Sequence, residues 1–429
     1  MSKPIVLAYS GGLDTSFLLP YLAETYAAPV ITVTVDTGGL SDTDRERIGE
    51  RSLALGAAEH VLLDARTTYF DEVLRFLIMG NVLRGHVYPL SVGAERALQA
   101  RLVAEVALAK GARAVAHGST AAGNDQVRFE VALRTLAPEL EILAPVRDEG
   151  FSREHEVAYL QARGHAFSAE RAAYSVNTGL WGCTIGGRET NDTLEPLPEH
   201  AWVLSKGALD SPRSPESHRL SFCAGIPTAI DGEALTPVAL IERLNALAAS
   251  FGFGRGIHLG DTIFGLKGRV AFEAPAALAL IETHRELEKL TLTARQQRVK
   301  DTVAQIYGDL VHEAQYVEPA CRDIEALLLS SQARVTGDVQ FRLSPGALFV
   351  EGMSSPYSLK RASRGVYGEA AGEWSAADAR GFSRLLGLAA MLHARAGRLP
   401  VTAAVTSDGA SARAGSVPAS RPAKHKGAN

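Results

Sequence analysis

Two hydrophobic periodicities alternate along the first 150 residues of the chain. Short apolar runs predict buried strands, whereas longer stretches with apolar residues at helical spacing predict helices. The predicted strands cover residues 4–9, 30–36, 59–65, 112–118 and 141–146. The predicted helices cover residues 15–26, 43–56, 69–80, 95–111 and 125–136. This order predicts an α/β domain with a doubly wound parallel sheet that carries helices on both faces.

Three polar loops rich in small residues follow strands of this predicted sheet. They are AYSGGLDTS at 8–16, VDTGG at 35–39 and HGSTAAGND at 117–125. Because ligands bind beyond the carboxyl ends of parallel strands, we expect the three loops to meet at one edge of the sheet. The sequence therefore predicts a single binding site built from these loops.

The pattern changes near residue 170, where polar and Pro-rich segments predict loops. Strand-like runs at 219–230, helices near 237–251, 275–290 and 291–309, and a hairpin at 337–353 follow. We predict a first domain at 1–170, an α+β domain at 171–375, a C-terminal helix at 376–396 and a disordered tail at 397–429.

Composition and charge narrow the class of protein. The 429 residues carry a net charge of −4 and are 46% hydrophobic, typical of a soluble protein without a basic field for nucleic acid or anionic membranes. The cysteines Cys183, Cys223 and Cys321 lie far apart, so neither a disulfide framework nor a zinc site is expected. We found no run that could serve as a signal peptide or span a bilayer. We therefore expect a cytoplasmic protein with no nucleic-acid or membrane partner.

The loop SGGLDTS allows four interpretations. A helix cap needs only one of Asp14, Thr15 and Ser16. A nucleophile elbow normally follows several strands, and the Walker A pattern G-x-x-x-x-G-K-[ST] is absent from the chain. We favour a pyrophosphate cradle, in which the backbone N–H groups of the glycine loop and the following helix N-terminus bind phosphates. In such a cradle Asp14 can hold a Mg²⁺ ion that bridges phosphate oxygens.

The loops AYSGGLDTS and HGSTAAGNDQVRFE together resemble the argininosuccinate synthase family within the N-type ATP pyrophosphatases. The similarity is strong over 4–150, patchier over 151–275, and returns in YGDLVHEAQYVEPACRDIEALLLSSQARVTGDV and SPYSL. The resemblance implies a HUP-type nucleotide-binding domain, a synthetase domain and a homotetramer with swapped C-terminal helices. It also implies the synthesis of argininosuccinate from ATP, citrulline and aspartate, through a citrullyl-adenylate, with AMP and pyrophosphate released.

Matching positions carry the family's binding roles into this chain, with Asp14 as the catalytic and Mg²⁺-binding residue. Those implied for ATP are Ala8, Tyr9, Ser10, Gly11, Gly12, Leu13, Asp14, Thr15, Ser16, Val35 and Gly118. Those implied for aspartate are Thr120, Asn124 and Asp125, and those for citrulline are Tyr88, Asn124, Arg128, Ser175 and Thr184. The spacing of Asn124 and Arg128 at a helix start puts both on one face, and arginine can grip a carboxylate with two hydrogen bonds.

Four positions implied for citrulline depart from the family pattern. Gly93 and Thr184 replace Ser, Gly260 replaces Glu, and Phe272 replaces Tyr. Two interpretations remain open. Either the neighbouring Asp261 supplies the missing carboxylate and citrulline is the acceptor, or the acceptor lacks a free α-ammonium, as an N-acylated citrulline does. A non-catalytic sensor of adenine nucleotides is the alternative from another class of protein.

Overall fold

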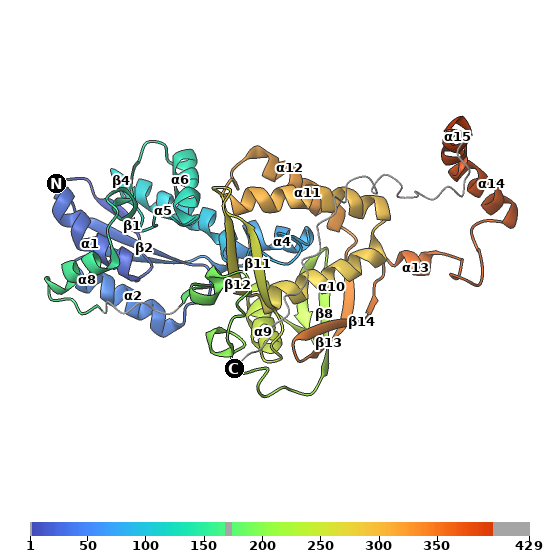
Figure 1. The fold of residues 1–429 in the computed structure, drawn as a ribbon, viewed down its shortest axis with the longest axis horizontal. Helices are drawn as coiled ribbons and strands as arrows, with labels where there is room; N and C mark the ends of the chain where they lie inside the picture. The colour runs from blue at the N-terminus through green and yellow to red at the C-terminus, as the bar shows by residue number, and fades with distance from the viewer. Residues whose placement is uncertain (1, 168–173, 398–429) are drawn as a thin grey trace, which may run out of the picture. The chain divides into compact units, whose positions relative to one another are not determined.

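The computed structural model describes residues 2–167 and 174–397 (Figure 1). It divides into two compact units, residues 1–359 and residues 360–429, and each is described by itself. Within the first unit, the predicted domain boundary at residue 170 stays a prediction.

The first half of the chain forms a five-stranded parallel sheet in the order β3-β2-β1-β4-β5. Its strands are β1 (Ile5–Ala8), β2 (Val30–Asp36), β3 (Glu59–Asp64), β4 (Ala114–Ala116) and β5 (Glu141–Leu143). The predicted α/β class and parallel sheet are confirmed. The first strand lies at the centre because β2 and β4 pair with its two edges, so the loop after β1 opens at the middle of the sheet.

Helices cover both faces of this sheet. Ile5 and Leu7 of β1 pack in a core with α1 (Leu13–Tyr26) and α8 (Arg153–Gln161), whereas Val6 packs with α5 (Arg96–Ala109) and α6 (Asp125–Leu136). Alternate residues of a strand point to opposite faces, so a strand buried on both faces is apolar throughout. The remaining helices of this half are α2 (Asp42–Ala54), α3 (Arg66–Tyr69), α4 (Arg75–Met79) and α7 (Pro145–Asp148). Where one helix was predicted at 69–80, a π-helical turn at Phe70–Leu74 joins α3 to α4.

The second half contains two antiparallel sheets. One has the order β10-β9-β8-β13-β14, and the other has the order β11-β12-β7-β6. The first contains β8 (Glu216–Cys223), β9 (Ile226–Ile230), β10 (Glu233–Ala234), β13 (Gly337–Ser344) and β14 (Ala347–Ser354). The second contains β6 (Ser175–Gly179), β7 (Gly182–Gly186), β11 (Arg255–Asp261) and β12 (Lys267–Glu273). The predicted hairpin at 337–353 is confirmed as β13 and β14, whereas the sequence analysis did not predict the second sheet.

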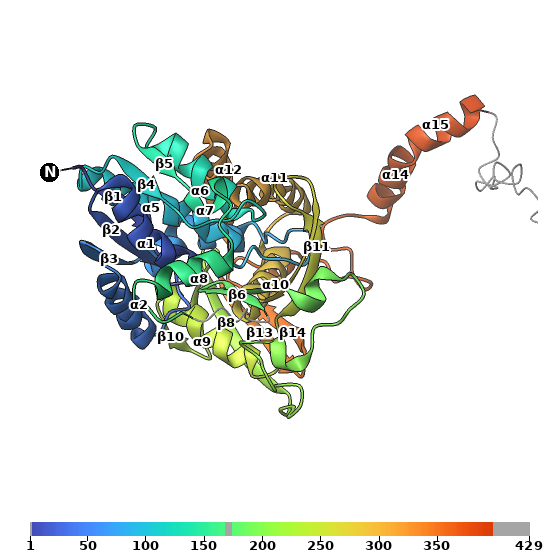
Figure 2. The same cartoon turned by 60° about the vertical axis from the view of Figure 1, so that its left-hand side comes forward.

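Four helices pack with these sheets around a large core that includes the fully buried Trp181, Tyr307 and Phe341 (Figure 2). They are α9 (Pro237–Ala249), α10 (Pro275–Thr291), α11 (Ala294–His312) and α12 (Pro319–Gln332). The sequence predicted a helix from residue 291, but α11 begins after Thr293. Thr293 and Gln296 form a capping box, which satisfies the N–H groups at this start.

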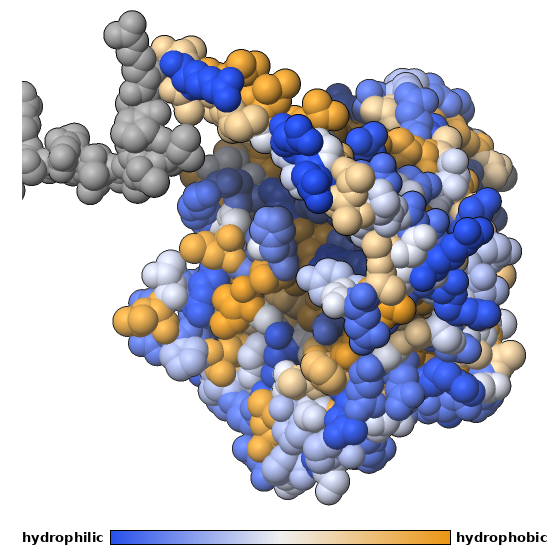
Figure 3. All heavy atoms as spheres, turned by 90° about the vertical axis from the view of Figure 1, so that its right-hand side faces the viewer, coloured by the Kyte–Doolittle hydropathy of each residue, from blue (hydrophilic) through white to orange (hydrophobic). Residues whose placement is uncertain are grey.

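The second unit contains two helices where one was predicted at 376–396. They are α14 (Ala376–Leu386) and α15 (Leu388–Gly397), and Gly387 lies between them. The short α13 (Leu359–Ala362) lies at the boundary of the two units. Apolar side chains of α14, among them Phe382 and Leu385, are exposed, and the face drawn in Figure 3 mixes hydrophobic and hydrophilic patches. The predicted disordered tail lies outside the described residues apart from Gly397.

Candidate active site

A cavity of about 760 Å³ lies at the carboxyl edge of the parallel sheet. Residues from all three predicted loops line it, together with parts of α5, α6 and β6. The predicted site residues on its wall are Ala8, Tyr9, Ser10, Gly12, Leu13, Asp14, Thr15, Val35, Gly118, Thr120, Asn124, Asp125, Arg128 and Ser175. Gly11, Ser16, Tyr88 and Thr184 are not among the lining residues. The structure thus brings the loops together as expected, and the ligand assigned to each residue stays a prediction.

The opening loop leaves the N-terminus of α1 without a side-chain cap. Gly11 has a φ of +72°, and Gly12 is the N-cap residue, with φ −75° and ψ 175°. The Thr15 hydroxyl donates to the Gly12 carbonyl at 3.4 Å, and Arg51 donates to the Gly11 carbonyl at 2.7 Å. These bonds hold the loop through its carbonyl groups. Because the first N–H groups of a helix have no intrahelical partner, this end of α1 can bind an anion.

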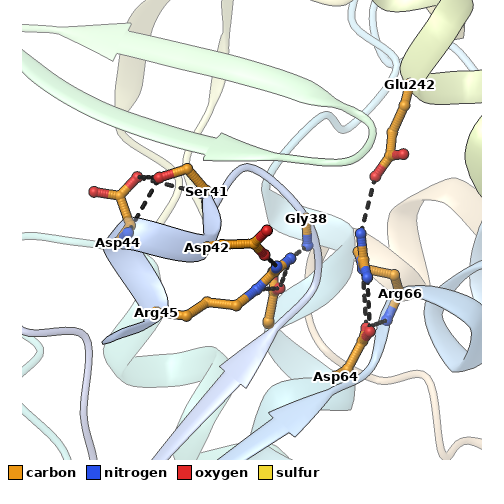
Figure 4. Close-up of polar contacts among 9 residues, drawn as sticks. Gly38, Ser41, Asp42, Asp44, Arg45, Asp64, Arg66 and Glu242 are labelled. Carbon is orange, nitrogen blue, oxygen red and sulfur yellow. Dashed lines mark hydrogen bonds and ion pairs between the residues drawn. The ribbon is translucent and has the colours of Figure 1, made fainter. Parts of the chain in front are cut away.

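Helix α2, which follows the second loop, is capped by its own side chains. Ser41 and Asp44 form a capping box there, and Arg45 pairs with Asp42 (Figure 4). Arg45 also pairs at 2.6 Å with Asp36, whose buried carboxylate accepts from the Gly38 N–H at 2.8 Å. The second loop is therefore fixed in place and its helix end is occupied, in contrast to the end of α1.

Figure 4 also shows how this edge is joined to the second half of the chain. Arg66 pairs with Asp64 at 2.7 Å, at the end of β3, and with Glu242 of α9 at 3.2 Å. Since all three side chains are partly exposed, the link contributes little stability but orients the two segments.

Asp14, in the first turn of α1, faces the cavity and has a second carboxylate beside it. Glu156 of α8 is buried against Asp14. Burial, and next the charge of Asp14, raise the pKa of Glu156 to about 8. The described residues contain no cluster of three His, Cys, Asp or Glu side chains that could hold a metal ion. A cation beside Asp14 would therefore take further oxygen ligands from a bound phosphate or from water.

A network of charged side chains forms the wall beside the third loop. Asp125 accepts from Arg96 at 3.1 Å and from Arg128 at 2.9 Å. Arg96 also donates to Glu95 at 2.7 Å. Burial by itself would raise the pKa of the Asp125 carboxyl, but Arg96 and Arg128 outweigh burial and lower it. Asp125 is therefore held as a carboxylate in a fixed orientation.

Arg128 and Asn124 also contact the second half of the chain. The Arg128 Nε donates to the His312 carbonyl at 2.9 Å, and the Asn124 Oδ1 accepts from the Ile263 N–H at 3.0 Å. Burial and the charge of Arg128 lower the pKa of His312 to about 3, so His312 is neutral near pH 7. Both side chains are thus positioned by segments that lie far away in the sequence.

Four residues that the resemblance assigns to citrulline lie on one face of the second sheet. They are Ser175, Thr184, Gly260 and Phe272. The strand register places Thr184 opposite Phe272, and Ser175 opposite Gly186 on the same face. Tyr88 covers this face: its ring stacks on His258, with centroids 5.4 Å apart, and lies 5.1 Å from the Phe272 ring. Tyr88, Thr184 and Ser175 share this face, but of the three only Ser175 lines the cavity. A citrulline-binding role for Tyr88 and Thr184 stays a prediction.

Gly260 and Gly93, which replace Glu and Ser of the family pattern, make room for neighbouring side chains. A Cβ atom on Gly260 would overlap with the His258 Nε2, and one on Gly93 would lie 3.0 Å from an Arg128 nitrogen. Asp261, which the sequence offered as a replacement carboxylate, is half-exposed and pairs with Lys267 at 2.7 Å. Its carboxylate is not among the groups that line the cavity.

Four further residues lie on the cavity wall or directly behind it and were not predicted from the sequence: Glu95, Arg96, Gln99 and Glu156. Glu95 and Arg96 stand at the start of a helix otherwise rich in Ala, Leu and Val. A charged pair at the start of an otherwise apolar helix could have indicated these two site residues, because charged side chains that become buried need partners or a function.

A parallel sheet whose central loop opens onto an uncapped helix, with a cavity at the carboxyl edge, defines a nucleotide-binding α/β protein. The chain belongs to the argininosuccinate synthase family. Residues 4–165 match the family described as the arginosuccinate synthase N-terminal HUP domain, and residues 174–393 match the arginosuccinate synthase C-terminal domain. The family identifies the protein as an enzyme, a ligase that uses ATP.

Similar proteins span nearly the whole chain. The argininosuccinate synthase of Dehalococcoides mccartyi is 38% identical over 398 residues, which cover 92% of this chain and 97% of the relative. That of Xanthomonas campestris is 39% identical over 404 residues, covering 92% and 100%. That of Pyrobaculum aerophilum is 38% identical over 394 residues, covering 90% and 97%. The resemblance read from the sequence is confirmed.

Proposed function

We propose that the chain joins citrulline to aspartate through a citrullyl-adenylate, converting ATP into AMP and pyrophosphate. The observation that carries this proposal is the meeting of the three polar loops on one cavity. A cavity that holds three substrates together converts bimolecular steps into intramolecular ones, which supplies much of the acceleration.

The loop at 8–16 would hold the phosphates of ATP. The N–H groups at the open end of α1 can bind the phosphate oxygens, and Val35 and Gly118, which line the same cavity, would contact the nucleotide. The ureido oxygen of citrulline attacks the α-phosphorus, and the bond to the β-phosphate oxygen breaks. The negative charge of the departing pyrophosphate is then stabilised by these N–H groups and the helix dipole.

Asp14 would hold the Mg²⁺ ion that accompanies ATP. Its carboxylate lies on the cavity wall, in the first turn of the helix whose N–H groups would bind the phosphates. One carboxylate, phosphate oxygens and waters form the type of ligand set that Mg²⁺ takes in ATP sites. When bound, the ion neutralises charge on the phosphates.

The third loop would bind the two amino acids. Thr120, Asn124 and Asp125 are assigned to aspartate, and Asn124, Arg128 and Ser175 to citrulline. Because Arg96 and Arg128 fix the Asp125 carboxylate, it can receive the ammonium group of aspartate in a defined position. The aspartate amine then attacks the adenylated carbon, and AMP leaves.

Product analysis tests this function. The full chain is incubated with ATP, Mg²⁺, citrulline and aspartate, and we expect argininosuccinate, AMP and pyrophosphate in equal amounts. Without aspartate, citrulline should still support exchange of labelled pyrophosphate into ATP. A nucleotide sensor would bind ATP and release no pyrophosphate. A preference for acetylcitrulline over citrulline in direct competition would instead support the N-acylated acceptor.

We further propose a cytoplasmic homotetramer. The exposed apolar side chains of α14, such as Phe382, Leu385 and Leu386, are suited to packing on another subunit. None of the described helices is long and apolar enough to cross a membrane.

A further inference from the structure

Glu95 is a buried carboxylate on the wall of the cavity to which the assigned substrate roles give no task. It ends the short 3-10 helix Gly93–Glu95, directly before α5, and only 2% of its surface is exposed. A carboxylate removed from water to this extent is costly unless its oxygens find partners or its charge is used.

The partners of Glu95 leave it able to accept a further hydrogen bond. The Thr37 hydroxyl donates to Oε2 at 2.7 Å, and Arg96 donates to Oε1 at 2.7 Å. Since each carboxylate oxygen has two lone pairs, one remains on each. Gln99 in turn donates to the Thr37 hydroxyl at 3.0 Å, which orients that hydroxyl toward Glu95. The carboxylate is therefore held in position from two sides.

Glu95 lies one guanidinium group away from Asp125. Arg96 donates to Glu95 through one terminal nitrogen and to Asp125 through Nε, at 2.7 Å and 3.1 Å. Both carboxylates line the same cavity. If Asp125 receives the ammonium group of aspartate, as in the proposed function on which this inference rests, Glu95 lines the same cavity as that group, one guanidinium away from Asp125.

The second half of the reaction needs a base at this place. The aspartate ammonium has no lone pair until it loses a proton, so it cannot attack while it is charged. We propose that Glu95 is the general base that takes this proton. The freed lone pair forms the C–N bond, and the C–O bond to AMP breaks, with its electron pair leaving on the phosphate oxygen. The proton that the new C–N nitrogen then sheds goes to the departing phosphate, and Glu95 returns its own proton to water.

The surroundings of Glu95 suit this task. Burial raises the pKa of its carboxyl to about 7, with Arg96 and the Thr37 hydroxyl opposing this rise and Asp125 adding to it. The charge of Glu95 acts on Tyr69 and Tyr88, and both tyrosines stay neutral near pH 7 because burial raises their pKa values. A base with a pKa near the working pH is both deprotonated and able to accept a proton.

The two half-reactions separate this role from a structural one. In Glu95→Gln, citrulline-dependent exchange of pyrophosphate into ATP should stay near the wild-type rate. The kcat for argininosuccinate should fall about 100-fold or more, the usual contribution of a general base. Glu105→Gln on the same helix, whose exposed carboxylate pairs with Arg101, is the matched control and should leave both rates unchanged. Equal losses in both half-reactions would assign Glu95 to the shape of the cavity and overturn the proposal.

The pH dependence provides a second measurement. The kcat of the wild type should rise as pH increases through about 7, and this limb should be lost in Glu95→Gln. Glu95→Asp, which keeps a carboxylate on a shorter arm, should retain the limb at a lower kcat. An unchanged pH profile in Glu95→Gln would refute the general base. A wild-type enzyme that makes no argininosuccinate would instead refute the proposed function itself.

Discussion

The two glycines of the opening loop differ in their conformations, and this difference yields a sharp test of the phosphate cradle. Gly12 has φ −75° and ψ 175°, an extended conformation that any residue adopts. A Cβ atom there would meet only the Ser10 Oγ within 4 Å, at 3.3 Å. Gly11 has φ +72°, and a Cβ on it would lie 3.0 Å from Ile48 Cγ1.

The consequences of Gly12→Ala and Gly11→Ala should therefore separate. Gly12→Ala adds a methyl group where phosphate must approach the backbone, while the fold accommodates it. Losing one hydrogen bond to a charged phosphate costs about 1.5–3 kcal/mol, which is about a 10- to 150-fold weaker Kd for ATP. Gly11→Ala should cost about 1–2 kcal/mol of folding stability, because a left-handed conformation is unfavourable for alanine.

Urea unfolding and calorimetric titration with a non-hydrolysable ATP analogue measure the two effects. The control is Gly352→Ala on β14, where a Cβ atom meets nothing within 4 Å. We expect Gly12→Ala to unfold like the control and to bind the analogue at least 10-fold more weakly, about 1.4 kcal/mol. If Gly12→Ala binds the analogue as the control does, the phosphates do not bind at this loop.

Four further predictions follow from the site and its surroundings. Asp125→Ala should slow argininosuccinate formation far more than citrulline-dependent pyrophosphate exchange, and equal losses would contradict its assignment to aspartate. Because the folded state raises the pKa of Glu95 from 4.5 to about 7, the wild type should lose stability as pH rises between these values, by about 3 kcal/mol. Glu95→Gln should remove this part of the pH-dependent loss and leave the part that Glu156 contributes through its own raised pKa, as urea unfolding at pH 4.5 and pH 8 would measure. Gly260→Glu should displace His258 and destabilise the fold by about 1–3 kcal/mol, and a His258→Ala background should relieve most of that cost. Truncation after Ala396 should leave the oligomer intact, whereas truncation after Ser375 should dissociate it, as light scattering would report.

The parallel sheet was predictable because its central strands β1, β2 and β4 are buried on both faces. Such strands consist of apolar runs like IVLA and VITVTVD, which need no partner strand to be recognised. The second sheet lacks this signal. Its edge strands SVNTG and RGIHLGD are short, polar or rich in glycine, and each pairs only with the neighbouring strand of a hairpin. The two hairpins form one sheet only where β12 pairs with β7, which places Glu273 opposite Cys183, and no local pattern signals that pairing.

The same distinction explains which site residues were found. The loop residues follow from a rule of topology, because the carboxyl ends of parallel strands meet at one edge. Glu95 and Glu156 come from helix starts with no motif. Glu95 lies on the cavity wall and Glu156 lies against Asp14 only because α5 and α8 pack against the sheet. Their charges are visible in the sequence, but their burial is not.

The residues that differ from the family pattern at the positions assigned to citrulline have neighbours that fit the change. The absence of a side chain at Gly260 leaves space that His258 fills, and its absence at Gly93 leaves space beside the Arg128 guanidinium. Asp261 pairs with Lys267 and is not among the residues that line the cavity, and its role as the replacement carboxylate stays a prediction. The polar groups missing from the family pattern have thus been exchanged for an imidazole and a closely packed guanidinium. Because the resemblance assigns these positions to the acceptor, we predict that its α-amino end meets different chemistry in this chain, and competition between acceptors is the measurement that tests this.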